Sequence, residues 1–494
     1  MDSVYEYVYK FVDSKIVYSW IIYLLKSTVI LPRMGFKMCI RVIAALYSVM
    51  VSLYNKVIYN SSINETLFQI YTNSPDFALI FTGLVALSLG TFVYIKLRYP
   101  FWSCQPVFKS YEFWRYAYRT PFIIRDYPMT TKYCDFNRMK TISYLDTSQE
   151  VKTRIIDLLR CKYIATDRLL YTINESILDA YMKGNLDIAF STTYMVNDKL
   201  RGFMCSRPIR LYFLGNSQLT AYYWDTICAD SDNHTTDSDN HTTDCAGNHT
   251  TSNPTATTNI QDRDITLRLI QTHEYNQRMH NPLVKISLFK KEIHLCSGII
   301  PLTKYKTTSY YLKPSKLHRL PHHMHVQHIV KTNIHIVLDL LEGLPSMDQS
   351  TFEFISLMDL GVLLNLIVTN QLYCFCLKYK RTILGYYFFK NSNIQYEDLA
   401  TSSTDCDTLH FIASYNNSRS LESFILGYIH SIKAILKLKK TFRMLLFDDI
   451  AHNGLILPSW KSVNQPLVET DCAYYLYNMV YPKTVQSNTC FILI

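Results

Sequence analysis

The chain ends in Cys490-Phe491-Ile492-Leu493-Ile494, a tail without a charged side chain. Chain termini are usually polar and frayed, so an apolar end favours a terminus that is drawn into an apolar interior. A carboxylate in such a place is costly unless it is paired or used, and desolvation raises its pKa toward the range of a general base. The Ile494 carboxylate is therefore a candidate proton acceptor. The alternative is that the tail is only a last strand packed on a sheet.

Four further stretches occur in a recognisable order and spacing. They are Phe101-Trp102-Ser103-Cys104-Gln105-Pro106-Val107, then Cys296-Ser297-Gly298-Ile299-Ile300-Pro301 followed by Ser309-Tyr310-Tyr311, then Tyr415-Asn416 with Asp449 and Asn453, and last Tyr474-Tyr475-Leu476-Tyr477-Asn478. Together they resemble the motifs of the N-myristoyltransferases (glycylpeptide N-tetradecanoyltransferases). The resemblance covers residues 100–494. It implies an α/β fold of two acetyltransferase-like (GNAT) halves with mixed sheets, and transfer of a myristoyl group from myristoyl-CoA to the N-terminal glycine amine of a protein.

The resemblance also implies a role for individual residues. Ile494 would accept the proton of the glycine amine, and backbone N–H groups of Tyr223 and Trp224 would stabilise the oxyanion. Residues expected at the acyl-CoA are Pro100, Phe101, Trp102, Tyr223, Trp224, Asp225, Thr226, Asp262, Arg263, Asp264, Ile265 and Thr266. Residues expected at the peptide are Ser297, Gly298, Tyr310, Tyr415, Asn416 and Asp449.

Several positions depart from the family pattern. Asp262 and Asp264 stand where the family has a serine and a basic residue, and acids suit a helix start but oppose a pyrophosphate. Asp225 would place a negative charge near the developing oxyanion. These departures keep a second hypothesis open, a catalytically inactive, N-myristoyltransferase-like membrane protein that binds acyl chains or myristoylated N-termini. A third is an acetyltransferase-like enzyme with another acyl donor.

Hydrophobic periodicity predicts the elements that would position these residues. Apolar spacing predicts helices over 151–160, 264–273, 352–370 and 421–440, paired strands over 200–214 and 219–227, and a hairpin over 372–378 and 382–390. We expect an N-terminal acyl-CoA-binding half over 99–330 and a C-terminal peptide-binding half over 331–494.

A polar near-repeat interrupts the first half at 231–259. Ser231-Asp232-Asn233-His234-Thr235-Thr236-Asp237 recurs directly afterwards. Such low-complexity sequence cannot bury a core, so we predict a disordered surface insertion. Its His and Asp residues do not predict a metal site, because a flexible tract does not fix ligand geometry.

The N-terminal region, residues 1–98, is predicted to hold membrane segments. Residues 77–95 carry no charge and are followed by Lys96 and Arg98, which predicts a transmembrane helix with the large domain facing the cytosol. A buried core helix is the alternative. Residues 16–31 and 38–54 are weaker candidates, either spans or interfacial helices, and membrane lipid is an expected partner.

Composition limits the partners. The formal net charge of +10 suits acyl-CoA, an anionic membrane surface or nucleic acid. Nucleic acid is ranked last and is not expected as a partner, since no dense Lys/Arg stripe alternates with aromatic residues. The 13 cysteines include no Cys-x-x-Cys pair, which favours a reduced compartment over a disulfide scaffold.

Overall fold

A computed structural model describes residues 75–112, 115, 120–164, 169–213, 217–230, 256–292, 296–312, 319–346, 351–396 and 406–494. The chain divides into two compact units, Met1–Leu97 and Arg98–Ile494. Most of the predicted insertion, 231–255, and two candidate membrane segments, 16–31 and 38–54, lie outside the described residues.

The first unit contributes one described helix, α5, which runs from Pro75 to Arg98. It covers the segment 77–95 that the sequence predicts as a helix. Over the part of the chain that the structure describes, no helix has both the length and the apolar character that crossing a bilayer requires.

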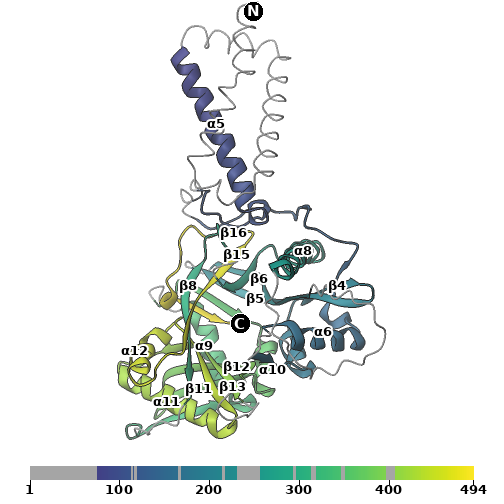
Figure 1. The fold of residues 1–494 in the computed structure, drawn as a ribbon. Helices are drawn as coiled ribbons and strands as arrows, with labels where there is room; N and C mark the ends of the chain where they lie inside the picture. The colour runs from purple at the N-terminus through teal and green to yellow at the C-terminus, as the bar shows by residue number, and fades with distance from the viewer. Residues whose placement is uncertain are drawn as a thin grey trace, which may run out of the picture. The chain divides into compact units, whose positions relative to one another are not determined.

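The second unit is built on one mixed sheet of 15 strands in the described residues, with the path β17-β10-β5-β6-β7-β15-β8-β14-β13-β12-β11-β9 and with β2, β3 and β4 attached beside it (Figure 1). The strands are β1 Phe122–Ile123, β2 Met139–Ser143, β3 Leu169–Tyr171, β4 Phe190–Val196, β5 Lys199–Phe213, β6 Ser217–Ala229, β7 Ser287–Glu292, β8 Thr303–Tyr311, β9 Met324–Ile329, β10 Phe354–Met358, β11 Leu372–Tyr379, β12 Thr382–Tyr396, β13 Cys406–Asn416, β14 Phe442–Asp448, β15 Val468–Tyr477, β16 Met479–Val480 and β17 Cys490–Leu493. β1 pairs with β16 apart from this sheet.

Helices cover this sheet in two groups. They are α6 Gln149–Lys162, α7 Glu175–Met182, α8 Ala256–His280, α9 His335–Gly343, α10 Leu360–Val368, α11 Leu421–Leu438 and α12 Asn453–Val463. α6 and α8 pack on the β4–β6 part, and α11 packs on β9, β11 and β12 beside α12 (Figure 1). The fold is thus α/β with a mixed sheet, as the sequence predicts.

The two predicted halves share this sheet. β10 and β17 come from the C-terminal half, yet β10 pairs with β5, with Met358 opposite Ile209. β15 likewise inserts between β7 and β8. The end of the chain therefore completes the first half of the fold instead of extending the second.

Local sequence explains where the helices lie. Ser148 caps α6 by accepting a hydrogen bond from Val151 N, and Ser420 caps α11 in the same way. The face that α11 buries recurs at helical spacing, over Phe424, Tyr428, Ile432 and Ile435. The predicted helices over 151–160 and 421–440 are confirmed to within a few residues.

Two predicted boundaries are wrong. The segment 352–370 is not one helix, because Phe354–Met358 is strand β10 and only Leu360–Val368 is helical. All of β10 is buried, and a short, fully buried apolar run has the same pattern in a strand as in a helix. The helix predicted over 264–273 begins earlier, at Ala256, inside the range assigned to the insertion.

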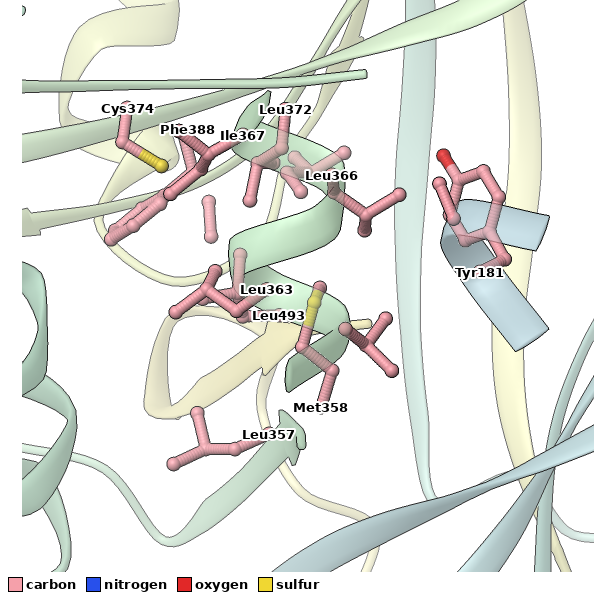
Figure 2. Packing of buried hydrophobic residues seen from close by; sticks show 14 of the residues in the cluster. Tyr181, Leu357, Met358, Leu363, Leu366, Ile367, Leu372, Cys374, Phe388 and Leu493 are labelled. Atoms are coloured by element: carbon pink, nitrogen blue, oxygen red, sulfur yellow. The ribbon is translucent and has the colours of Figure 1, made fainter. Parts of the chain in front are cut away.

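Figure 2 shows the core beneath α10, where side chains of β10, β11, β12 and the C-terminal tail converge. Leu363 and Leu366 of α10 lie in this core with Leu493 of the tail, and all three are fully buried. Phe491 belongs to the same core, whereas Ile492 and Ile494 lie in a different one. The tail therefore packs apolar side chains on both of its faces, which is why its sequence does not alternate.

Candidate functional site

A β-bulge lies at the residues predicted to hold the acyl-CoA thioester. Between β5 and β6, Cys205 pairs with Thr226 and Ser206 pairs with Trp224, so Asp225 has no partner of its own across the ladder. A bulge disrupts the ladder locally and re-aims the backbone groups beside it. Backbone N–H groups of the predicted oxyanion segment, Tyr223 to Thr226, are therefore placed at an irregularity instead of in a regular ladder.

β6 also separates from β7 at this point. The two parallel strands pair only from Tyr222 with Ser287 to Trp224 with Phe289. Beyond Phe289, β7 continues to pair with β15, while β6 continues to pair with β5. In the described ladder, the β7-facing edge of β6 after Trp224 thus has no strand beside it. Backbone groups on such an edge can bind an extended ligand as an added strand would.

The buried C-terminus lies on the same face as Tyr223. Ile494 is 7% exposed, and the tail strand β17 pairs in parallel with β10, with Leu493 opposite Leu357. The tail is therefore a strand of the sheet with a buried terminal residue, and the role of its carboxylate as a base stays a prediction. Ile494 belongs to a group we call the tail cluster, which includes Ile209, Leu211, Tyr223, Leu288, Tyr305, Phe354, Tyr474, Leu476 and Ile492.

Trp224 points to the opposite face, as alternation along a strand requires. There it joins a group we call the aromatic cluster, which includes Phe101, Trp102, Tyr133, Leu269, Phe289, Cys296, Tyr475 and Tyr477. Phe289 stacks between two indoles, 4.4 Å from the Trp224 ring and 5.9 Å from the Trp102 ring. The structure thus brings Phe101, Trp102 and Trp224 together, but as a packed core. Pro100 is exposed beside them.

The five residues predicted at the start of α8 do not lie at its start. Asp262 to Thr266 fall beyond the first turn, since the helix begins at Ala256. Asp264 forms an ion pair with Arg268, with 2.7 Å between Oδ2 and Nε. Ile265 packs against the aromatic cluster, and Arg263 is exposed. The acids are therefore not at the helix N-terminus, where the phosphate-binding expectation had placed them.

A polar network lies between α8 and the sheet. Glu274 Oε1 accepts hydrogen bonds from Trp224 Nε1 at 2.6 Å and from Ser287 Oγ, and burial raises the pKa of this carboxyl. Beside it is a small pocket that Arg125 and Arg278 line. Gln105 Nε2 and Glu274 Oε2, both of pocket-lining residues, are buried without a hydrogen-bond partner in the described residues. The sequence did not predict this pocket.

Ser297 and Gly298, expected at the peptide, form a turn against the segment that precedes the first motif. Gly298 has φ +84, and a Cβ there would lie 2.7 Å from Cε1 of Tyr99. Glycine is required on both counts, for the left-handed backbone and for the close ring. Gly298 O accepts a hydrogen bond from Ser110 N, so this glycine couples the two sequence motifs.

The other expected peptide residues lie in different packing environments. Tyr310 is fully buried in the core beneath α11, edge-on to Trp460, apart from the tail cluster. Tyr415 stacks on His452 at 5.6 Å, and Asn416 N donates to His452 Nδ1 at 2.9 Å. The sequence missed His452, whose burial lowers its pKa to about 4. Phe352 links it to Phe491 of the tail, with ring centroids 5.0 Å and 5.4 Å from Phe352.

Asp449, the last expected peptide residue, is half-buried, and burial raises the pKa of its carboxyl. The neighbouring carboxylate of Asp448 has several charged and polar partners. Asp448 Oδ2 lies 2.9 Å from His410 Nε2 and 3.6 Å from Lys290 Nζ, and Thr307 Oγ1 donates to Oδ1 at 2.6 Å. Burial alone would raise the Asp448 pKa, but His410 and Lys290 hold it well below its ordinary value.

A second buried ion pair lies at the bulge. Arg207 Nε lies 2.7 Å from Asp225 Oδ2, and Arg207 is 0% exposed. Burial alone would raise the pKa of Asp225, yet Arg207 and Lys390 keep it below its ordinary value. Lys390 interacts electrostatically with both ion pairs, and burial lowers its pKa to about 8. We call Arg207, Asp225, Lys290, Lys390, His410 and Asp448 the charged cluster.

Comparison with solved structures identifies proteins that share this fold. No family model and no curated sequence matches the chain. A solved structure of Saccharomyces cerevisiae N-myristoyltransferase with bound myristoyl-CoA matches with a TM-score of 0.56 and 14% identity, over 78% of this chain and 94% of that chain. Another structure of the same yeast enzyme with myristoyl-CoA gives 0.56 and 13%, over 80% and 94%. The chain therefore has the N-myristoyltransferase fold, and the resemblance seen in the sequence is confirmed at that level.

Proposed function

We propose that this protein transfers an acyl group, myristoyl, from myristoyl-CoA to the N-terminal glycine amine of a protein. The observation that carries the proposal is the position of the bulge, since the irregular backbone at Tyr223 to Thr226 lies where β6 leaves β7, and the Tyr223 side chain packs in the same cluster as Ile494. The fold shared with structures that contain myristoyl-CoA supports it.

In the proposed reaction, each of two protein groups has one task. Backbone N–H groups at the bulge donate to the thioester oxygen as it becomes negative, which favours the tetrahedral state. The amine nitrogen attacks the carbonyl carbon, the C–S bond breaks, and the coenzyme leaves as a thiolate that takes up a proton from solvent. The Ile494 carboxylate takes the proton of the attacking amine. General base catalysis of this kind contributes about 10²–10⁴ in rate.

The charges near the bulge fit this chemistry better than the sequence suggested. Asp225 would oppose an oxyanion if it stood alone, but its carboxylate is paired with Arg207. Asp264 is likewise paired with Arg268, outside the first turn of α8. Neither acid is an unpaired charge that faces a substrate anion.

We also propose that the large unit faces the cytosol and that the N-terminal region attaches it to a membrane. The proposal is supported by the uncharged stretch 77–95 and by the basic residues Lys96 and Arg98 that follow it. Its test is protease treatment of intact microsomes, which should digest the chain after Pro100. Protection of the large unit would contradict it.

A second function is favoured by the aromatic cluster. Phe101, Trp102 and Trp224, expected to contact the coenzyme, instead pack on one another. A protein that binds acyl chains or myristoylated N-termini without catalysis would have no need of that coenzyme site.

The experiment that decides between them uses the full chain in detergent with myristoyl-CoA and a glycine-terminal peptide. Native mass spectrometry detects the coenzyme complex, and peptide mass detects transfer. We expect both signals, and no transfer to a matched peptide with an acetylated N-terminus. A coenzyme complex without transfer to any glycine-terminal peptide would contradict catalysis. The absence of both signals would contradict the proposed acyl transfer and favour the non-catalytic function, which needs no coenzyme site.

A further inference from the structure

Arg207 is a fully buried arginine whose two terminal nitrogens have no hydrogen-bond partner among the described residues. Its Nε is taken by Asp225 Oδ2 at 2.7 Å. Its two terminal nitrogens, Nη1 and Nη2, are buried and have no hydrogen-bond partner among the described residues. A guanidinium carries five N–H donors, and buried polar groups are almost always satisfied by protein, water or ligand. The two terminal nitrogens without partners therefore indicate that Arg207 holds a bound group.

The surroundings restrict the direction from which that group can bind. The guanidinium carbon lies 5.6 Å from the Tyr181 ring and 5.5 Å from the Tyr223 ring, over the face of each. Two aromatic faces therefore cover part of the cation, and the Nη1–Nη2 edge is the part without a hydrogen-bond partner among the described residues. A planar fork of this kind matches the two oxygens of a carboxylate.

The charge of the side chains around Arg207 also favours an anionic ligand. Lys390 Nζ lies 4.6 Å from the Tyr181 ring that also covers Arg207, and Lys390 also interacts with Lys290 and Asp448. The charged cluster thus holds three basic side chains, Arg207, Lys290 and Lys390, with two carboxylates, Asp225 and Asp448, besides His410. Uncompensated charge in an interior is costly. An anionic ligand would balance it, whereas a neutral one would leave the excess in place.

We propose that Arg207 binds the carboxylate of a free long-chain fatty acid. The choice of ligand rests on the proposed function, because Arg207 pairs across the ladder with Tyr223, at the bulge where the acyl carbonyl would lie. A thioester is uncharged and is served by backbone donors. A fixed guanidinium edge is matched to the free acid, so the site distinguishes an unesterified fatty acid from its coenzyme ester and from an alcohol of equal length.

The test measures binding of three probes to the full chain in detergent: sodium myristate, tetradecanol and myristoyl-CoA. We expect myristate to bind roughly tenfold to a hundredfold more tightly than tetradecanol, as hydrogen bonds to a charged group imply. Arg207→Met/Asp225→Leu, which removes the ion pair without leaving a lone charge, should abolish that preference. Arg207→Lys keeps the charge without the fork, so the preference should fall but persist.

Arg210→Met is the matched control. Arg210 lies on the same strand, is partly exposed and pairs with Asp359 at 3.4 Å, so its loss should leave the preference unchanged. A melting curve of each variant shows whether it folds. If the double variant does not fold, the comparison rests on Arg207→Lys.

The outcomes separate this site from the proposed function. Tight binding of myristate without binding of myristoyl-CoA supports the carboxylate site and contradicts the acyl transfer. Binding of myristoyl-CoA with equal affinity for myristate and tetradecanol overturns the carboxylate site alone, and indicates that ordered water satisfies Arg207. An unchanged preference in the double variant also overturns it, and no binding of any probe overturns both.

Discussion

The guanidinium of Arg207 pairs with the carboxylate of Asp225 at the one residue of β6 that the bulge leaves without a cross-strand partner, with 2.7 Å between Nε and Oδ2. An acid at an oxyanion site would be unfavourable alone. The pair converts it into part of a buried, partly cationic region. Charge and backbone irregularity thus coincide at the residues on which the proposed chemistry depends.

Replacing one partner of this pair should cost more than replacing both. Arg207→Met leaves the mostly buried Asp225, whose side chain is 16% exposed, without its ion-pair partner, and we expect a loss of about 3 kcal/mol in the free energy of unfolding. Arg207→Met/Asp225→Leu should lose far less, since a buried ion pair replaced by apolar residues is often neutral. Urea denaturation of the single and double variants measures the coupling. If the double variant lost as much stability as the two single variants together, Arg207 and Asp225 would not stabilise each other.

Stability should fall as the pH falls from 6.5 toward 4. His452 has a pKa lowered to about 4 by burial, so the unfolded chain binds a proton over this range and the folded chain does not. The stabilisation is complete above pH 6.5 and is lost as the pH approaches 4, by ~2 kcal/mol between pH 7 and 5. Buried His273, with a pKa lowered to about 3, adds a similar loss.

His452→Phe should therefore reduce the slope of unfolding free energy against pH, whatever it does to stability at pH 7. His325 is exposed on β9, and His325→Gln is the control that should leave the slope unchanged. Urea denaturation at pH 7 and pH 5 makes the comparison. Equal slopes in His452→Phe and the parent would mean that His452 is protonated in the folded chain.

Gly298→Ala should destabilise the second unit by about 1–3 kcal/mol, through a left-handed backbone and contact with the Tyr99 ring. Gly298→Ala/Tyr99→Leu should recover the part due to the ring. Gly90 of α5 has no atom within 4 Å of an added Cβ, so Gly90→Ala should be neutral or slightly stabilising. Thermal melting ranks the variants, and a Gly298→Ala as stable as the parent would contradict the geometry.

The features that the sequence predicted well depend on local pattern. The hairpin of β11 and β12 follows two apolar runs separated by a short polar segment, and the pair β5 and β6 follows alternating side chains. The buried tail was predictable because Ile494 and its neighbours carry no charge. Motif order was enough to indicate the fold although identity to the matching structures is only 14%.

The missed features depend on contacts between distant parts of the chain. Arg207 and Asp225 lie on neighbouring strands, and Lys390 comes from β12 in the other half. No spacing in the sequence links them. The available signal was an arginine in the middle of a strand, between the apolar stretches 203–205 and 208–209. His452 was missed because the motifs pointed to Asn416 and Asp449, while the histidine that accepts a hydrogen bond from Asn416 N belongs to no motif.

The measurement closest to the central claim is acyl transfer by a chain whose carboxylate has been moved. Adding one glycine after Ile494 displaces the carboxylate by up to about 3.5 Å, and proton transfer needs roughly 3 Å between heavy atoms. We predict that the extended chain still binds myristoyl-CoA but transfers myristate to a glycine-terminal peptide at least ~100-fold more slowly than the parent. Transfer at the parental rate by the extended chain would contradict catalysis by the Ile494 carboxylate.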